Sequence, residues 1–337
     1  MNLKEYTQAM RPAVEEQLQS FLTRSLPGET PEIREMLAYH MGWEGEGAGP
    51  EAQGKRIRPL LVLLTAEASG GCWQDALPAA AAVELLHNFS LIHDDIQDNS
   101  PLRHGRPTVW KKWGMPQAIN AGDVMFTLSF LSVLDLAPRL PAAHVLDASR
   151  ILQQTCLRLT QGQYLDISYE KSLELPMDAY WPMIGGKTSA LLACCTELGA
   201  LCAGATPERR DAFRRYGYSL GLAFQVLDDW LGIWGDAEMT GKSTESDLAT
   251  GKKTLPVLHG LAQDGPFSRR WLQGDIAPEE VPALARMLED AGADQQTLAT
   301  AERLTGEALA ALHEAALENS AATALTDLTH QLLKRKN

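Results

Sequence analysis

The sequence lacks several features that would each define a class of protein. Its five cysteines are an odd number and form no CxxC pair, which argues against a disulfide framework or a zinc or redox motif. Its unbroken apolar runs fall well short of the roughly 20 residues that a membrane-spanning helix needs, and the first residues lack the apolar core of a secretion signal. We therefore expect reduced core cysteines in a cytoplasmic protein without a membrane span.

Basic residues are also scarce relative to acidic ones, and the formal net charge is -13. A nucleic-acid binder normally presents a basic face that neutralises phosphates, so no nucleic-acid partner is expected. An anionic substrate would have to meet these carboxylates through cations.

Period-2 strand patterns are missing as well, whereas helical spacing of apolar residues runs through almost the whole chain. Two such stripes are Leu3, Tyr6, Met10, Val14, Leu18 and Phe21, and Leu146, Ile151, Leu152, Cys156 and Leu159. With 337 residues, 45% of them hydrophobic, the chain can bury a large core. The pattern predicts an all-α fold of roughly ten or more helices in a single domain spanning residues 1–337.

Two aspartate clusters end apolar helical runs. Asp94 and Asp98 stand four residues apart, so their side chains share one helix face and would repel each other unless a cation lay between them. Asp228 and Asp229 close a second run, and Asp166 ends a third. Oxygen ligands of this kind suit magnesium. Each cluster alone could equally be a solvated helix end.

Basic residues supply a complement to the carboxylates. Lys55 and Arg58 lie at the start of a predicted helix, whose free backbone amides favour anions, and His87 lies two turns before Asp94. The lysines that follow glycines at bends are Lys187, Lys242 and Lys252. The segment "TGKST" is not a phosphate-binding P-loop, because its upstream glycine and strand are missing. Together these residues predict two anionic groups, one bound through metal and one bound directly by cations.

The ordered series "GKRIRP", "ELLHNFSLIHDDIQD", "RHGRPT", "NAGD", "GQYLD", "GKTS", "FQVLDD", "TGKS" and "GKKTLP" resembles the trans-isoprenyl diphosphate synthases, or polyprenyl synthetases, from about residue 54 to residue 256. The resemblance implies a homodimer of antiparallel helices around a deep apolar cavity, the isoprenoid synthase type I fold, with helices from about 266 to 334 completing the bundle. It also implies that an allylic diphosphate is ionised and that its carbocation alkylates isopentenyl diphosphate.

The resemblance further implies roles for individual residues. Asp94, Asp98 and Asp228 would hold roughly three magnesium ions on the allylic diphosphate, with Asp95 as a further metal ligand and Asp166 and Asp229 as nearby ligands or water-bridged supports. The diphosphate would be neutralised by Arg103, Lys187, Lys242 and Lys252, and Gln225 and Thr188 would lie near the reacting carbons. Isopentenyl diphosphate would be bound by Lys55, Arg58 and His87.

Two positions depart from the family pattern. His104 stands where family members commonly carry a second arginine that helps to bind isopentenyl diphosphate, and Arg106 is a candidate to compensate. Gly232 stands where a second aspartate motif would carry its last carboxylate. The spacing of Asp228, Gly232 and Asp236 resembles class I terpene cyclases, so a cyclase remains an alternative, as does a non-catalytic synthase-like subunit.

Product length is argued from Phe89, which lies five residues before Asp94 and therefore deeper along the same helix. Its ring would form the floor of the cavity, while Ser90 leaves more room than a second aromatic residue. The resemblance then implies mainly geranylgeranyl diphosphate as product, with farnesyl diphosphate next.

Overall fold

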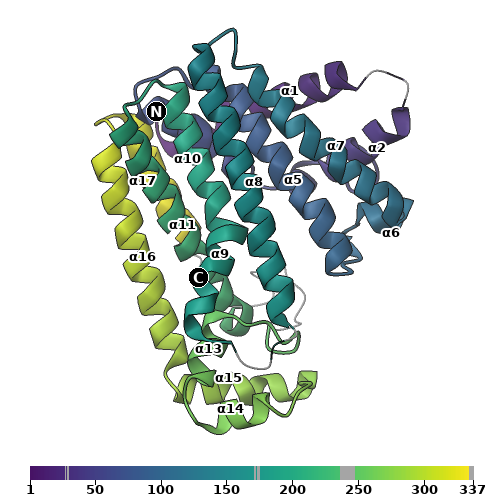
Figure 1. Cartoon of the computed structure of the whole chain (residues 1–337), viewed down its shortest axis with the longest axis vertical. Coiled ribbons are helices and arrows are strands. Elements are labelled where there is room, and N and C mark those ends of the chain that lie inside the picture. The colour runs from purple at the N-terminus through teal and green to yellow at the C-terminus, as the bar shows by residue number, and fades with distance from the viewer. Residues whose placement is uncertain (27, 29, 171, 173–174, 236–246, 334–337) are drawn as a thin grey trace. The chain divides into compact units, whose positions relative to one another are not determined.

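The computed structural model describes residues 1–26, 28, 30–170, 172, 175–235 and 247–333. The described residues are almost entirely helical, with one short two-stranded ribbon (Figure 1). This confirms the all-α fold class. By its contacts the chain divides into two compact units. Unit 1 comprises Met1–Cys156, Cys194–Asp211 and Ala315–Leu325, and unit 2 comprises Leu157–Ala193, Ala212–Glu314 and Thr326–Asn337.

Unit 1 holds the N-terminal helices and the ribbon. Its elements are α1 (Leu3–Ser25), α2 (Pro31–His40), α3 (Pro50–Gln53), α4 (Ile57–Ala68), η1 (Trp73–Ala76), α5 (Leu77–Gln97), β1 (Leu102–Arg103), β2 (Arg106–Pro107), α6 (Val109–Trp113) and α7 (Met115–Leu134). The unit boundaries fall within α8 (Ala142–Glu170), α10 (Ala190–Cys202), α11 (Pro207–Trp234), α16 (Ala293–Ala315) and α17 (Ser320–Leu333). Unit 2 adds η2 (Met177–Ala179), α9 (Tyr180–Ile184), η3 (Gly185–Ser189), α13 (Leu255–Leu261), α14 (Pro266–Trp271), η4 (Pro278–Glu280) and α15 (Val281–Asp290).

The first helix shows how the sequence sets local structure. Asn2 accepts a hydrogen bond from the Glu5 amide at 3.0 Å, and the Glu5 carboxylate accepts one from the Asn2 amide at 2.9 Å. This reciprocal cap satisfies two amides that have no partner within the helix. All six residues of the predicted stripe from Leu3 to Phe21 are buried. Unit 1 is then centred on α5, which packs along α4 and α7. Figure 1 shows α5 and α7 side by side.

The apolar patterns of α7 and α8 do not all point inward. Leu146 belongs to the second apolar stripe but is 66% exposed, because α8 turns that side chain away from the unit 1 core that contains Leu152 and Cys156. Helix α7 has the length and mean hydropathy of a membrane-spanning helix, although polar residues interrupt its apolar runs, and 44% of that window is buried. A core helix of a water-soluble protein passes the same test.

The predicted state of the cysteines is confirmed for most of them. All five are free, and Cys156, Cys194, Cys195 and Cys202 are buried, whereas Cys72 is exposed. Burial raises the pKa of Cys194 to about 12, so this thiol is not reactive at neutral pH.

Candidate active site

The carboxylates of the first cluster lie at the C-terminal end of α5. The helix ends at Gln97, and the amide of Asp98 donates to the carbonyl of Asp94 at 2.8 Å. The two side chains are therefore one turn apart on one face, as predicted. Asp94 is half-buried and Asp98 is exposed, so both carboxylates are accessible to a cation.

Asp95 points the other way and is only 2% exposed. Arg103 donates to it through Nε, at 3.1 and 3.0 Å, and through Nη2, at 2.8 Å. Burial raises the pKa of Asp95, while the hydrogen bonds and charge of Arg103 act to lower it. The bidentate pair engages both oxygens of Asp95. Asp95 is thus paired with Arg103, whereas Asp94 and Asp98 are the two carboxylates of the three that solvent reaches, and all three remain predicted metal ligands.

Arg103 is held by the ribbon β1–β2. Leu102 pairs with Pro107 and Arg103 with Arg106, and the connecting residues His104 and Gly105 have φ angles of 50° and 73°. Two left-handed residues make the tight turn that matches the twist of a hairpin. His104 is exposed, and its pKa is lowered by partial burial of the ring and by Arg103.

Arg106 is buried and already engaged. Its guanidinium donates to the carbonyls of Glu46, Tyr39 and Glu44 at 2.9, 2.8 and 2.8 Å. Every nitrogen of the fork therefore has a partner. Arg106 holds the 39–46 segment against the ribbon, so it does not compensate for the arginine that His104 replaces.

The predicted cationic group lies on α4 and α5 of unit 1. Lys55 is exposed just before α4, and Arg58 and His87 are half-buried. Among the described residues, Nε of Arg58 and Nδ1 of His87 are buried without a hydrogen-bond partner. Burial, and then the positive charge of Arg58, lowers the pKa of His87 well below its usual value. Unsatisfied polar atoms of this kind are costly unless a ligand supplies their partners.

Phe89 packs in a cluster of rings. Its centroid lies 5.0 Å from that of Phe126 on α7 and 4.9 Å from that of His93, and Phe126 lies 4.9 Å from Phe130. Ser90 donates to the carbonyl of His87 at 2.8 Å, which directs its hydroxyl back along the helix. The predicted floor residue is thus backed by two further aromatic residues on α7 that the sequence pattern did not single out.

In unit 2, two glycines bring α8 and η3 into backbone contact. An ideal Cβ on Gly162 would lie 2.1 Å from the amide nitrogen of Lys187, and one on Gly186 would lie 2.6 Å from the carbonyl oxygen of Arg158. Only glycine permits this approach. The turn η3 is a π-helical turn, and it places Lys187 in an ion pair with Asp166, one helical turn after Gly162.

A chain of hydrogen bonds connects η3, α11 and α9. Thr188 donates to Oε1 of Gln225 at 2.7 Å, and Nε2 of Gln225 donates to Asp229 at 2.9 Å. Asp229 also accepts from the Tyr180 hydroxyl at 2.7 Å and the Leu255 amide at 3.0 Å. Burial raises the pKa of Asp229 to about 7, although its three donors act to lower it.

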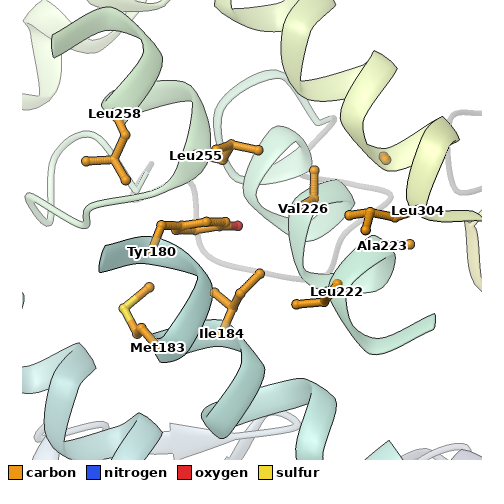
Figure 2. Packing of buried hydrophobic residues seen from close by; sticks show 10 residues of the cluster. Tyr180, Met183, Ile184, Leu222, Ala223, Val226, Leu255, Leu258 and Leu304 are labelled. Carbon is orange, nitrogen blue, oxygen red and sulfur yellow. The ribbon is translucent and has the colours of Figure 1, made fainter. Parts of the chain in front are cut away.

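The ring of Tyr180 is clamped by apolar side chains. It is fully buried among residues that include Ile184, Val226 and Leu255, and Figure 2 shows its hydroxyl directed toward the helix that carries Val226. With both oxygens engaged, Asp229 fits the predicted alternative of a support rather than a direct metal ligand. Asp228 is half-buried, whereas Asp229 is buried. The sequence motifs did not identify Tyr180, because it belongs to none of them.

Gly232 lies against a carboxylate from another part of the chain. An ideal Cβ on Gly232 would stand 2.0 Å from Oδ2 of Asp247, and the Asp247 amide donates to the Gly232 carbonyl at 3.4 Å. A side chain at position 232 and the observed position of Asp247 are therefore mutually exclusive. Asp247 was missed by the sequence reasoning, because it lies outside the aspartate motif. Lys252 is exposed, and Asp236 and Lys242 lie outside the described residues.

Comparison with known proteins identifies the family of this chain. A model of the polyprenyl synthetase family matches residues 49–288. The chain belongs to the polyprenyl synthetase family. A curated relative, the (2E,6E)-farnesyl diphosphate synthase of Mycobacterium tuberculosis, is 39% identical over 316 residues, which cover 91% of this chain and 87% of the relative. The geranylgeranyl diphosphate synthase of the same organism is 43% identical over 242 residues, or 71% of this chain and 68% of that protein.

Solved structures agree with the polyprenyl synthetase assignment. The crystal structure of a polyprenyl synthetase from Streptomyces coelicolor A3(2) matches with a TM-score of 0.87 at 35% identity, covering 98% of this chain and 100% of that chain. A geranylgeranyl pyrophosphate synthetase from Pyrococcus horikoshii matches with a TM-score of 0.88 at 29% identity, over 99% of each chain. The predicted isoprenoid synthase fold is thereby confirmed along nearly the whole chain.

Proposed function

We propose that this polyprenyl synthetase elongates prenyl chains by condensing an allylic diphosphate with isopentenyl diphosphate. Its relatives carry the names of farnesyl and geranylgeranyl diphosphate synthases, which supports elongation as the reaction class. The retained Asp94 and Asp98 argue against a non-catalytic subunit.

Magnesium fits the residues that are present. Within the part of the chain that the structure describes, no three acidic, histidine or cysteine side chains converge into a ready-made cage. Magnesium takes one or two carboxylates and completes its shell with water and phosphate oxygens, so accessible Asp94 and Asp98 in unit 1 and Asp228 in unit 2 are suitable ligands. Bound there, magnesium would stabilise the negative charge that develops on the leaving diphosphate.

The chain's own cations would bind diphosphate oxygens directly. Arg103 is oriented by Asp95 and Lys187 by Asp166, so each presents its charge in a fixed place. Donors aimed at the leaving oxygens stabilise the transition state more than the ground state. Thr188 and Gln225 would lie beside the reacting carbons, and Lys242 and Lys252 remain predicted diphosphate ligands. The deep apolar cavity that would shelter the carbocation from water also remains a prediction.

The observation that carries the proposal is the second anion site on α4 and α5. Buried Nε of Arg58 and Nδ1 of His87 have no partner among the described residues, and exposed Lys55 lies three residues before Arg58 in sequence. The diphosphate of isopentenyl diphosphate would supply the acceptors. A cyclase, which ionises one substrate, has no use for a second diphosphate site.

The product that we propose is mainly geranylgeranyl diphosphate, with farnesyl diphosphate next. Phe89 and its neighbours Phe126 and Phe130 form a continuous group of rings that would end the cavity. A rigid, packed floor would set the longest chain that fits, because displacing a packed ring disrupts the surrounding core.

We also propose that the enzyme is a cytoplasmic homodimer with a single catalytic domain. Helix α7 exposes apolar side chains near both of its ends, at Met115 and Ile119 and at Leu131 and Leu134, each between 42% and 53% exposed. A second copy would cover these exposed apolar side chains. Light scattering coupled to gel filtration tests this, with the variant Leu131→Glu expected to give monomers.

The reaction is tested by a product assay. Purified protein is incubated with magnesium, isopentenyl diphosphate and each allylic diphosphate from dimethylallyl to geranylgeranyl, and products are analysed before and after phosphatase treatment. We expect magnesium-dependent, chain-extended diphosphates that disappear with EDTA. Hydrocarbons or alcohols released without phosphatase, and without consumption of isopentenyl diphosphate, would instead support the cyclase. The absence of any product with every allylic substrate would support the non-catalytic subunit.

A further inference from the structure

Arg56 stands between two predicted ligands of isopentenyl diphosphate but is not itself exposed to substrate. Its side chain is 4% exposed, while neighbouring Lys55 is exposed and Arg58 is half-buried. Arg56 caps α4 with a left-handed backbone, at φ 51° and ψ 40°. A non-glycine residue in this region is strained, so the surrounding contacts must impose it.

Those contacts come from three directions. Nε of Arg56 donates to Glu15 of α1 at 2.7 Å, Nη1 donates to Glu84 of α5 at 2.8 Å, and Nη2 donates to the Met41 carbonyl at 3.1 Å. Burial acts to lower the pKa of Arg56, but Glu84 and Glu15 raise it above its ordinary value. The guanidinium is thus a permanent charge fixed in orientation by at least three hydrogen bonds.

The ion pair between Arg56 and Glu84, here called the clamp, joins the two elements that bear the second anion site. Arg56 lies two residues before Arg58, and Glu84 lies three residues before His87. Glu84 is 5% exposed and is itself fixed by Asn88, whose Nδ2 donates to its carbonyl at 2.8 Å and to Oε1 at 3.0 Å. The clamp therefore connects the start of α4 to α5 about one turn before His87.

An anion site needs such a connection because its own side chains do not provide one. Arg58 lowers the pKa of His87, so a protonated His87 and Arg58 would repel each other before a substrate arrives. No ion pair joins Arg58 to a carboxylate among the described residues. Burial lowers the pKa of Arg58, and the charges of Cys195 and Glu84 oppose that effect only in part. Glu84 thus acts on both arginines of the segment, but it forms its ion pair with Arg56 alone.

We propose that Arg56 is a positioning residue for isopentenyl diphosphate: through Glu84 it holds Lys55 and Arg58 of the α4 start at the distance from His87 that one diphosphate spans. This inference rests on the proposed function of the α4–α5 anion site. It differs from a purely structural role, because a buried ion pair is by itself weak evidence for stability, and similarly shaped uncharged residues often replace one without loss.

Two conservative variants test the clamp. Arg56→Lys keeps the charge but lacks the planar fork, and Glu84→Gln keeps the shape and an acceptor oxygen but lacks the charge. Arg34→Lys, on the exposed face of α2, is the matched control. Isothermal titration calorimetry measures the Kd of isopentenyl diphosphate with no allylic substrate present, so that no turnover occurs. Steady-state kinetics give the KM of the allylic substrate, and thermal unfolding gives Tm.

We expect the Kd of isopentenyl diphosphate to rise by about tenfold or more in Arg56→Lys and Glu84→Gln, with the allylic KM within about twofold of wild type. The control should leave both constants unchanged. An unchanged Kd in either variant overturns the positioning role, and so does a loss of binding that only follows the loss of folded protein. A wild-type chain that neither binds isopentenyl diphosphate nor elongates would instead overturn the proposed function.

Discussion

A single methyl group at Gly232 probes the contact between α11 and the segment that begins at Asp247. In Gly232→Ala the new Cβ would lie 2.0 Å from Oδ2 and 2.8 Å from Cγ of Asp247, so the carboxylate must retreat by more than about 1 Å to reach van der Waals distance. Its backbone is restrained, since the Asp247 carbonyl accepts from the Lys252 amide at 3.1 Å and from the Thr250 hydroxyl at 3.2 Å. The side chain must therefore rotate away from α11.

Stability and activity should respond differently to this change. Replacing glycine by alanine in a helix gains about 1 kcal/mol, and overpacking costs about 1–3 kcal/mol, so the net loss is about 0–2 kcal/mol. Tm should thus fall by no more than a few degrees. The Asp247 carboxylate lies against Gly232, which is four residues past Asp228 on α11. Displacing this carboxylate should lower kcat by about tenfold or more and raise the magnesium concentration needed for half-maximal rate.

The assay is steady-state elongation at graded magnesium concentrations, paired with thermal unfolding. Gly306→Ala is the matched control, because an ideal Cβ on this glycine of α16 meets nothing within 4 Å, and it should gain stability without losing activity. The double variant Gly232→Asp with Asp247→Ala moves the carboxylate onto the aspartate motif and should recover activity lost by Asp247→Ala alone. Wild-type kinetics and magnesium dependence in Gly232→Ala would refute the reasoning.

Three further predictions follow from the two units. Phe89→Ala should lengthen the products, and adding Phe126→Ala should lengthen them again, as read by chromatography of the dephosphorylated alcohols. Burial raises the pKa of Asp229 to about 7, so the folded protein retains a proton that the unfolded chain loses near pH 4. The free energy of unfolding of the metal-free protein should therefore fall as pH rises from about 4 to 7. Asp229→Asn should abolish that slope. The pKa of His104 is lowered, so its positive charge is lost as pH rises toward neutrality; the affinity for isopentenyl diphosphate should weaken over that range, and His104→Arg should remove the dependence.

Each of these has a defined contradictory result. Unchanged product length in Phe89→Ala would show that its ring is an ordinary core residue. An equal pH slope in wild type and Asp229→Asn, measured by denaturant unfolding, would assign that slope to other groups. If affinity titrations give the same pH profile for wild type and His104→Arg, His104 does not contact the diphosphate.

The sequence predicted those features that depend on spacing within one helix. The stripe from Leu3 to Phe21 and the shared face of Asp94 and Asp98 need only the helical period, and both are found. The same period does not show which apolar residues of a helix face the core, so it did not reveal that Leu146 is exposed. Nothing in the spacing could show that Asp229 is enclosed by its donors.

Pairings between elements were not predictable. Asp95 and Arg103 meet because a hairpin turns back on α5, and Arg106 is engaged by carbonyls of a segment that precedes it by about 60 residues. Asp247 reaches Gly232 across a segment that carries no periodic pattern. Such contacts depend on the tertiary fold, and a sequence motif contains only one of the two partners.

The π-helical turn Gly185–Ser189 makes the length of this segment as important as its residues. A π turn bonds each residue to the fifth along, so it holds one residue more than an α-helical turn. Deleting one residue would restore α-helical register and rotate Lys187 about the helix axis by about 100°, away from Asp166. Substitutions leave that register intact, so a mutational library should tolerate many exchanges around Lys187 while rejecting every single-residue deletion. In relatives that share the active site, the extra residue of the π turn would then be as characteristic of this segment as the lysine itself.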